Sequence, residues 1–157
     1  QVTHYYGAGA YSPKVTLENK QGKAFPESSA ILSVQYDTTV PSIGLTYPSS
    51  PNKASSWGTV RGRASDSQAG VDEVGVCLFR SAGSREQYYN FTSRKWVNYT
   101  EGSSAGLFGR PSVSAAGAWS LPVSSQAKGW RLDIGYFAMD KIGNETDLIW
   151  SAVTLSS

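Results

Sequence analysis

Side chains that commonly carry catalysis are scarce in this sequence. His4 is the only histidine and Cys77 the only cysteine, and His4 has no acidic neighbour along the chain. A Ser-His-Asp or Cys-His arrangement requires nucleophile and base within hydrogen-bond reach, so the N-terminal segment would have to fold over the rest. Adjacent Asp72 and Glu73 would face opposite sides of a strand and not pair as the carboxylates of a glycosidase. We predict no catalytic residues and no enzymatic activity.

Cys77 also limits covalent and metal chemistry. A single cysteine excludes an intrachain disulfide and a zinc site built from several thiolates. We expect Cys77 to be a small buried hydrophobe. Intermolecular pairing and a reactive thiol are the alternatives.

Charge and composition narrow the classes of partner. The formal net charge is +2, and the basic residues are scattered from Lys14 to Lys141 without forming a stripe, so we expect no nucleic-acid partner. No run of about 18 apolar residues is present, and we expect no membrane span. Abundant Ser, Thr and Gly, together with Trp, Tyr and Phe, are typical of exposed β-structure.

Alternating apolar residues predict the strands that position any site. In residues 130–140, Trp130, Leu132, Ile134, Tyr136 and Ala138 share one face. Residues 74–78 form a second such run, with Gly75 and Cys77 on a covered reverse side. Further strands are predicted at residues 42–47, 57–64, 87–91, 95–99, 118–123 and 148–155. Roughly seven strands with turn residues between them predict an all-β fold, as a two-sheet antiparallel sandwich or a small barrel.

An ordered set of short elements resembles a known family. The elements are residues 37–41 (Asp-Thr-Thr-Val-Pro), 62–66 (Gly-Arg-Ala-Ser-Asp), 70–76 (Gly-Val-Asp-Glu-Val-Gly-Val), the Tyr88 and Trp96 pair, 119–122 (Trp-Ser-Leu-Pro) and 136–144 (Tyr-Phe-Ala-Met-Asp-Lys-Ile-Gly-Asn). Together they resemble the immunoglobulin-like repeats, related to fibronectin III and cadherin modules, of large bacterial surface proteins and adhesins. The resemblance implies an immunoglobulin-like sandwich over residues 37–157 and an extracellular, cell-surface location.

The resemblance also implies a role for part of residues 1–36. In tandem arrays of such repeats, the run before the residue 37–41 element is the last strand of the preceding domain, and residues 30–36 occupy that place. Only about 30 residues precede this run, too few for another sandwich. The predicted pairing residues are Ile31, Leu32, Val34 and Tyr36, and residues 14–19 offer a shorter candidate strand.

Three fates are open to this orphan strand, because an unpaired edge is prone to associate. It folds back onto its own domain, it completes the sheet of a neighbouring copy by β-augmentation, or its natural partner lies outside this sequence. Pairing between identical copies in the second case would propagate head to tail into a filament.

Loop residues predict a calcium site once the sandwich fold is assumed. The start of the first strand, the loop after the second and the loop before the last lie at one end of such a sandwich. The residues expected to converge there are Asp37, Asp66, Asp72, Asp140 and Asn144. Several hard oxygen ligands on loops suit Ca²⁺. Ordinary turn chemistry of Asp and Asn is the alternative, and no other cofactor is expected.

Three sequons, at Asn90, Asn98 and Asn144, predict N-glycosylation sites in an exported protein. A glycan on Asn144 would compete with the calcium site, because a glycosylated amide needs access to solvent.

Aromatic residues offer a second reading, binding of a glycan by stacking on exposed rings. The candidates are Trp57, Tyr88, Tyr89, Trp96 and Trp119. The alternative is that most of them fill the core of the sandwich.

The function predicted from these patterns is structural. The chain is expected to be an extracellular subunit of a surface filament or array, with identical subunits as partners, assembled through donor strand 30–36. The alternatives are an adhesin, spacer or carbohydrate-binding module of a larger secreted protein, which has neighbouring immunoglobulin-like domains as partners, and an accessory domain of a secreted enzyme.

Overall fold

The structure, a computed structural model, describes residues 2–6, 32–49, 52–53, 57–102, 104–124 and 128–156. Within these residues it contains strands and turns but no helix. The strands are β1 (Val2–Tyr6), β2 (Leu32–Tyr36), β3 (Ser42–Tyr47), β4 (Asn52–Lys53), β5 (Thr59–Ser65), β6 (Val71–Ala82), β7 (Arg85–Asn90), β8 (Lys95–Asn98), β9 (Ala118–Pro122), β10 (Arg131–Asp140) and β11 (Ile149–Ser156). The described residues include no helix that could cross a membrane.

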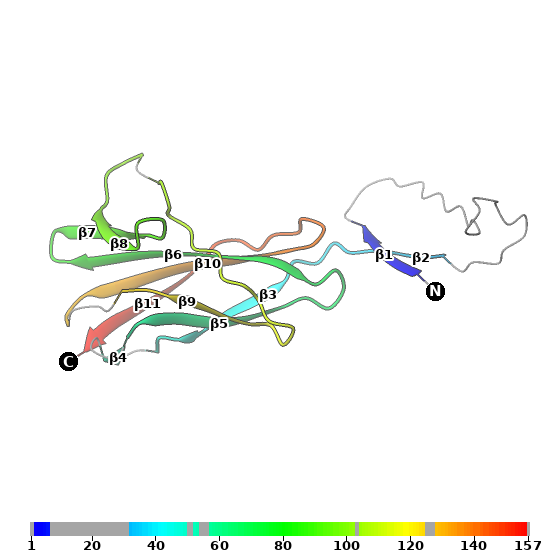
Figure 1. Cartoon of the computed structure of the whole chain (residues 1–157), viewed down its shortest axis with the longest axis horizontal. Coiled ribbons are helices and arrows are strands. Elements are labelled where there is room, and N and C mark those ends of the chain that lie inside the picture. Colours follow the sequence, from blue (N-terminus) through cyan, green and yellow to red (C-terminus); the bar gives the residue numbers. More distant parts are fainter. Residues whose placement is uncertain are drawn as a thin grey trace, which may run out of the picture.

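Two sheets form a sandwich (Figure 1). One sheet has the strand order β4-β11-β10-β6-β7-β8 and the other the order β3-β5-β9. The chain crosses between the sheets after β5, returns with β9 and crosses again to β10, as in an immunoglobulin-type sandwich. Within these two sheets, all pairings are antiparallel except that of β4 with β11. The predicted all-β sandwich fold is confirmed, and the barrel alternative is excluded because the two sheets remain separate.

Alternation along the two central strands builds the core. The even-numbered residues Leu132, Ile134, Tyr136 and Ala138 of β10 are buried, as are Val74, Val76 and Leu78 of β6. Val60, Ala64 and Trp119 cover them from the opposite sheet, and Trp57 fills the interior beside β5. Burying an aliphatic or aromatic side chain of this size stabilises a fold by about 1.5–3 kcal/mol. This set of facing residues therefore holds the two sheets together.

The predicted strand positions agree with those in the structure to within two residues at each end for residues 42–47, 57–64, 87–91, 95–99, 118–123, 130–140 and 148–155. The run at residues 74–78 proves to be the middle of β6, which continues to Ala82. Both faces of its centre are covered, because Phe137 lies over Gly75 on the outer side. Strands β1 and β4 were not predicted.

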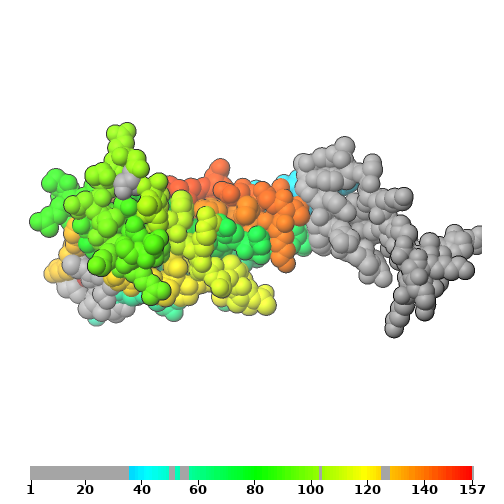
Figure 2. Space-filling view, turned by 45° about the horizontal axis from the view of Figure 1, so that its top comes forward, coloured from blue at the N-terminus to red at the C-terminus, as the bar shows by residue number. Residues whose placement is uncertain are grey.

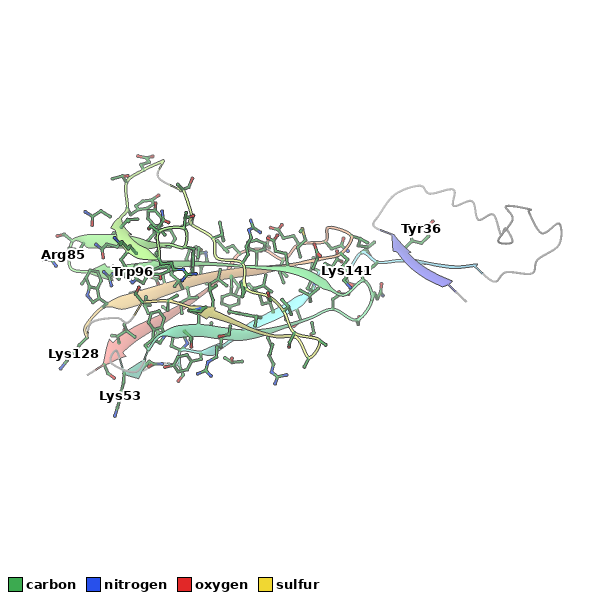
Figure 3. The ribbon with its side chains drawn as sticks, viewed as in Figure 1. Tyr36, Lys53, Arg85, Trp96, Lys128 and Lys141 are labelled. Atoms are coloured by element: carbon green, nitrogen blue, oxygen red, sulfur yellow. The ribbon has the colours of Figure 1, made fainter. Side chains whose placement is uncertain are left out.

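A cation–π stack closes the sandwich at the end where β7 and β8 lie. The Arg80 guanidinium lies 4.4 Å from the Trp96 ring and 4.3 Å from the Trp130 ring. The same group donates hydrogen bonds to Oε1 of Gln87 on β7. Figure 3 shows Trp96 far from Tyr36, towards the opposite end of the molecule. Arg80 thereby links the two central strands of the sheet to its edge.

The N-terminal arm forms a separate small sheet. Strands β1 and β2 pair in parallel, with Val2 opposite Leu32 and Tyr6 opposite Tyr36. Figure 1 shows this pair beyond the end of the sandwich, on the line that continues into β3. Ile31 and the candidate strand at residues 14–19 lie outside the described residues.

Candidate functional site

Three carboxylates from three separate loops meet at the end of the sandwich nearest the arm. Asp37 follows β2, Asp66 follows β5 and Asp140 ends β10, and one ligand oxygen from each lies within 4.8 Å of the others. Asp37 and Asp140 are 0% and 1% exposed, whereas Asp66 is half-buried. In Figure 2 the orange β10–β11 loop lies at one end of the sandwich and the β7–β8 region at the other.

Each of these carboxylates also organises its own loop. Asp37 Oδ1 accepts hydrogen bonds from the Thr39 amide at 3.0 Å and the Thr39 hydroxyl at 2.7 Å, and its Oδ2 accepts one from the Ala69 amide at 3.0 Å. Asp66 Oδ1 accepts from the amides of Gln68 and Gly70, at 2.9 and 2.8 Å. The bonds from Thr39, Gln68 and Gly70 are the local turn chemistry expected of Asp. The bond from Ala69 is a long-range contact that ties Asp37 to the β5–β6 loop.

Asn144 connects two of the carboxylate positions. Its backbone amide donates to Asp140 Oδ1 at 2.9 Å, and its side-chain amide donates to Asp140 Oδ2 at 2.7 Å. The same side-chain amide donates to the backbone carbonyl of Asp37 at 3.2 Å. The loop after β10 is therefore tied both to itself and to the root of the arm.

Hydrogen bonding dominates the electrostatics of Asp37. The hydroxyl of Thr39 lowers the pKa of the Asp37 carboxyl below its ordinary value, with further lowering from the backbone amides of Thr39 and Ala69, while burial opposes them. Because these bonds favour the charged form, Asp37 contributes a negative charge to the cluster.

The ligand atoms of this acidic cluster (Asp37, Asp66 and Asp140) suit a hard cation. They are all carboxylate oxygens, which Ca²⁺ prefers as ligands. Among the described residues, the ion pairs within 4.0 Å join Arg110 to Glu73 and Arg131 to Asp133. Neither pair includes a carboxylate of the acidic cluster. Ca²⁺ binding remains a prediction, in which Asp37, Asp66 and Asp140 would supply ligands and Asn144 would hold Asp37 and Asp140 in place.

Asp72 does not join the cluster. The ladder between β6 and β10 pairs Met139 with Glu73 and Asp140 with Val71, so Asp72 is the residue that the register skips. Its side chain is exposed. This irregularity of pairing arises only from the long-range register, and no local signal in the sequence marks it.

The three sequons differ in how far their amides are engaged. The Asn90 side-chain amide donates to the Ala105 carbonyl at 2.9 Å, and that of Asn144 is bound within the loop cluster. Asn98 is exposed at the end of β8, and its Oδ1 accepts from Gln87 at 3.0 Å. Glycosylation remains a prediction, and the geometry favours Asn98 as the acceptor, because a glycan on either of the others would replace existing hydrogen bonds.

Most of the aromatic residues predicted to bind a glycan are interior. Trp57, Tyr88, Tyr89 and Trp119 are at most 3% exposed, as the core-filling alternative expects. Trp96 is partly buried and stacks beneath Arg80.

An aromatic group that the sequence analysis did not single out lies on the outer face of the larger sheet. The ring of Phe79 lies 5.9 Å from that of Trp150 and 5.7 Å from that of Tyr99. Trp150 is 51% exposed and Tyr99 45%. The alternation of residues 149–156 was the available signal, since it puts Trp150 on the face opposite Val153 and Leu155.

The thiol of Cys77 is the remaining candidate for covalent chemistry. Cys77 is 1% exposed, which confirms its expected burial. Desolvation raises the pKa of the Cys77 thiol to about 11. The group is therefore neutral at physiological pH and a poor nucleophile.

Comparison with known proteins shows a similarity at the level of structure. No protein-family profile matches the chain, and no curated protein matches it. A solved structure of fibronectin(III)-like modules of CbhA from Clostridium thermocellum is similar, with 14% sequence identity and a TM-score of 0.45. The similarity covers 87% of this chain and 57% of that one, so the chain spans little more than half of that structure's length. The strand order described above remains the basis for the fold.

Proposed function

We propose that this chain is an extracellular structural module that joins identical copies by β-strand addition, with Leu32–Tyr36 as the donor strand. The observation that carries the proposal is the position of β2. It lies beyond the sandwich, and among the described residues it pairs only with the five-residue strand β1, in parallel. The expected filament is the form that such joining takes when it repeats head to tail.

Strand energetics support a partner outside this two-stranded sheet. An isolated pair of short strands is marginally stable in water, and parallel pairing is slightly weaker per residue than antiparallel pairing. β2 also has alternating apolar residues, Leu32, Val34 and Tyr36, and Tyr36 is 54% exposed. A strand of this composition gains stability by adding to a larger sheet.

The acidic cluster fits the same role. It lies where the arm leaves the sandwich, because Asp37 directly follows β2. A bound Ca²⁺ at this point would stiffen the junction between sandwich and arm and so hold the donor strand in a defined direction.

The test compares self-association of the full chain with that of a strand-blocked variant. Val34→Pro removes one backbone donor from β2, and Val34→Thr keeps both the donor and a β-branched side chain. We expect dimers or larger assemblies for the wild type and Val34→Thr in analytical ultracentrifugation, and monomers for Val34→Pro. Negative-stain imaging separates filaments from small closed assemblies. A wild-type chain that stays monomeric at high concentration contradicts the proposal.

A binding module is the second candidate, favoured by the outer-face group of Phe79, Tyr99 and Trp150. Exposed indole and phenol rings stack well on sugar faces. Screening against a glycan array tests this function directly, with Trp150→Ala as the variant expected to lose binding and Tyr36→Ala as a control outside the group. Failure of the wild type to bind any glycan removes the carbohydrate reading.

A further inference from the structure

Most of the exposed apolar side chains come from two short segments of the chain. Six large apolar residues are exposed in the described part of the chain, and five of them come from two segments, residues 36–40 and 148–150. They are Tyr36, Val40, Leu148, Ile149 and Trp150. A shallow groove lined by Val40, Ile43, Thr146 and Ile149 joins the segments. Residues 40–43, which lead from the arm into β3, thus lie beside the first residue of β11.

An open sheet edge begins beside this groove, at Ile149 of β11. β4 pairs with β11 only at Leu155 and Ser156. Leu155 exchanges backbone hydrogen bonds with Trp130 and Gly129, so odd-numbered residues of β11 direct their amides and carbonyls towards β10. By alternation, those of Trp150, Ala152 and Thr154 point away from β10. The parallel pair of Asn52 with Leu155 involves the residues of β11 that flank Leu155, so the groups of Trp150 and Ala152 are the ones left at the free edge.

We propose that the edge at residues 150–154 of β11 is the acceptor for Leu32–Tyr36 of a second copy of this chain. The inference rests on the proposed function and names the surface that it requires. β4 blocks the Leu155 end of the edge, whereas the Ile149 end opens on the groove. The donor therefore enters with Tyr36 at the mouth, antiparallel to β11.

The pairing has a defined register. Ending the donor where β4 begins sets Tyr36 opposite Trp150 and Val34 opposite Ala152, with Leu32 beside Thr154 at the end of the free edge. Antiparallel pairing is the more stable arrangement, and it satisfies backbone groups that the sandwich leaves open. Apolar residues of the donor would also cover the exposed side chain of Trp150.

A second copy fits the edge better than the chain's own arm does. To fold back, the arm would have to reverse at Asp37. Both carboxylate oxygens and the carbonyl of that residue are held, by Thr39, Ala69 and Asn144. Figure 1 shows β2 continuing away from the sandwich along the line of β3. The arm therefore extends towards a neighbour.

The direction of the donor strand decides the symmetry. Acceptor residues 150–154 pair with residues 131–135 of β10, in the half of the sandwich away from the arm, so a donor antiparallel to β11 sets the long axes of the two copies in opposite directions. A two-fold axis relates such copies, and reciprocal exchange of arms is then isologous and closes as a dimer. A head-to-tail filament would need the donor to run parallel to β11. We expect this contact to produce a two-fold dimer, with any filament requiring a further contact.

The acceptor edge is tested in the full chain. Ala152→Pro removes a donor that points to the free edge and takes none from the β10 ladder, and Ala152→Thr is the matched control that keeps it. We expect the wild type and Ala152→Thr to sediment as dimers and Ala152→Pro as a monomer with an unchanged far-UV circular dichroism spectrum. A dimer with Ala152→Pro overturns the acceptor assignment.

A disulfide cross-link tests the same register without requiring a proline variant to fold. A chain with Val34→Cys is mixed with a chain with Ala152→Cys and oxidised, and the predicted register gives a covalent dimer of the two. Ser120→Cys, exposed on β9 of the other sheet, replaces Ala152→Cys as the control and should give several-fold less cross-link. Equal cross-linking with both partners overturns the register. A link formed within one chain that has both Val34→Cys and Ala152→Cys shows the folded-back arm instead.

The two proline variants distinguish strand donation by β2 from the assignment of β11 as the acceptor. If Val34→Pro dissociates the assembly but Ala152→Pro does not, strand donation stands and the acceptor lies elsewhere. If the wild type is monomeric, or if neither proline variant changes its association, strand donation itself is wrong.

Discussion

The side-chain amide of Asn144 donates a hydrogen bond to the backbone carbonyl of Asp37 at 3.2 Å, across 107 positions of sequence. It ties the β10–β11 loop to the residue at which the arm meets the sandwich. The same amide also donates to Asp140 Oδ2, so one side chain connects a buried carboxylate with the exit of the donor strand.

Replacing this amide should destabilise the sandwich. Asn144→Ala removes both bonds and leaves the buried Asp140 carboxylate with fewer donors, at an expected cost of about 1–3 kcal/mol. Urea unfolding followed by tryptophan fluorescence measures it. Asn98→Ala, at an exposed position, is the control and should change the free energy of unfolding by less than about 0.5 kcal/mol. Equal effects of the two variants would contradict the role assigned to Asn144.

Calcium should raise the melting temperature if the acidic cluster binds it, because a ligand that binds only the folded state stabilises it. Asp66→Asn keeps the acceptor Oδ1 for the Gln68 and Gly70 amides but removes the charge, so the calcium-dependent rise should be lost. Asp72→Asn, outside the cluster, should keep it. Calorimetry with Ca²⁺ and with EDTA makes the measurement, and identical melting of the wild type in both would exclude the site.

Asp37 should contribute to acid sensitivity. Its pKa is lowered in the folded state, so its stabilisation is present above the ordinary value of 3.8 and is lost as pH falls through the folded value. Between about pH 5 and pH 2 the wild type should lose more stability than Asp37→Asn, which has no such group to protonate. Urea midpoints across this range give the comparison. Parallel pH profiles of the two proteins would count against the assignment.

Cys77 should be protected from alkylation. Burial raises the pKa of its thiol from 9.0 to about 11, so iodoacetamide at pH 8 should leave the native protein unmodified and modify it fully in urea. The unfolded thiol ionises first as pH rises, so stability should fall between pH 9 and 11. Intact mass reports the modification, and rapid labelling of the folded protein would refute the assigned burial.

The Arg80 stack should depend on the flat guanidinium as well as on its charge. Arg80→Lys keeps the charge but loses planar contact with Trp96 and Trp130, and we expect a loss of about 1–2 kcal/mol. Arg85→Lys, exposed beside the β6–β7 turn, is the matched control with little expected change. Urea unfolding compares them. An unaffected Arg80→Lys would show that charge alone is sufficient there.

Local pattern was enough to predict much of the fold. Period-two alternation in residues 130–140 and 74–78 follows from strand geometry, in which successive side chains face opposite sides. The buried even-numbered residues of β10 and β6 match that pattern. The same reasoning left the roles of Trp57 and Trp119 open between core and glycan stacking, because composition does not show which aromatic residues face inward.

What the sequence by itself determined was the all-β class, the strand positions and the turn-forming acidic residues, since each depends on neighbours a few positions apart. Tertiary structure alone decided that Asp37, Asp66 and Asp140 share a site while Asp72 does not. It also decided that Trp150 is exposed over Phe79 and that β4 covers only the last residues of the β11 edge. These relationships depend on the register between strands far apart in sequence, where a shift of one residue reverses every face.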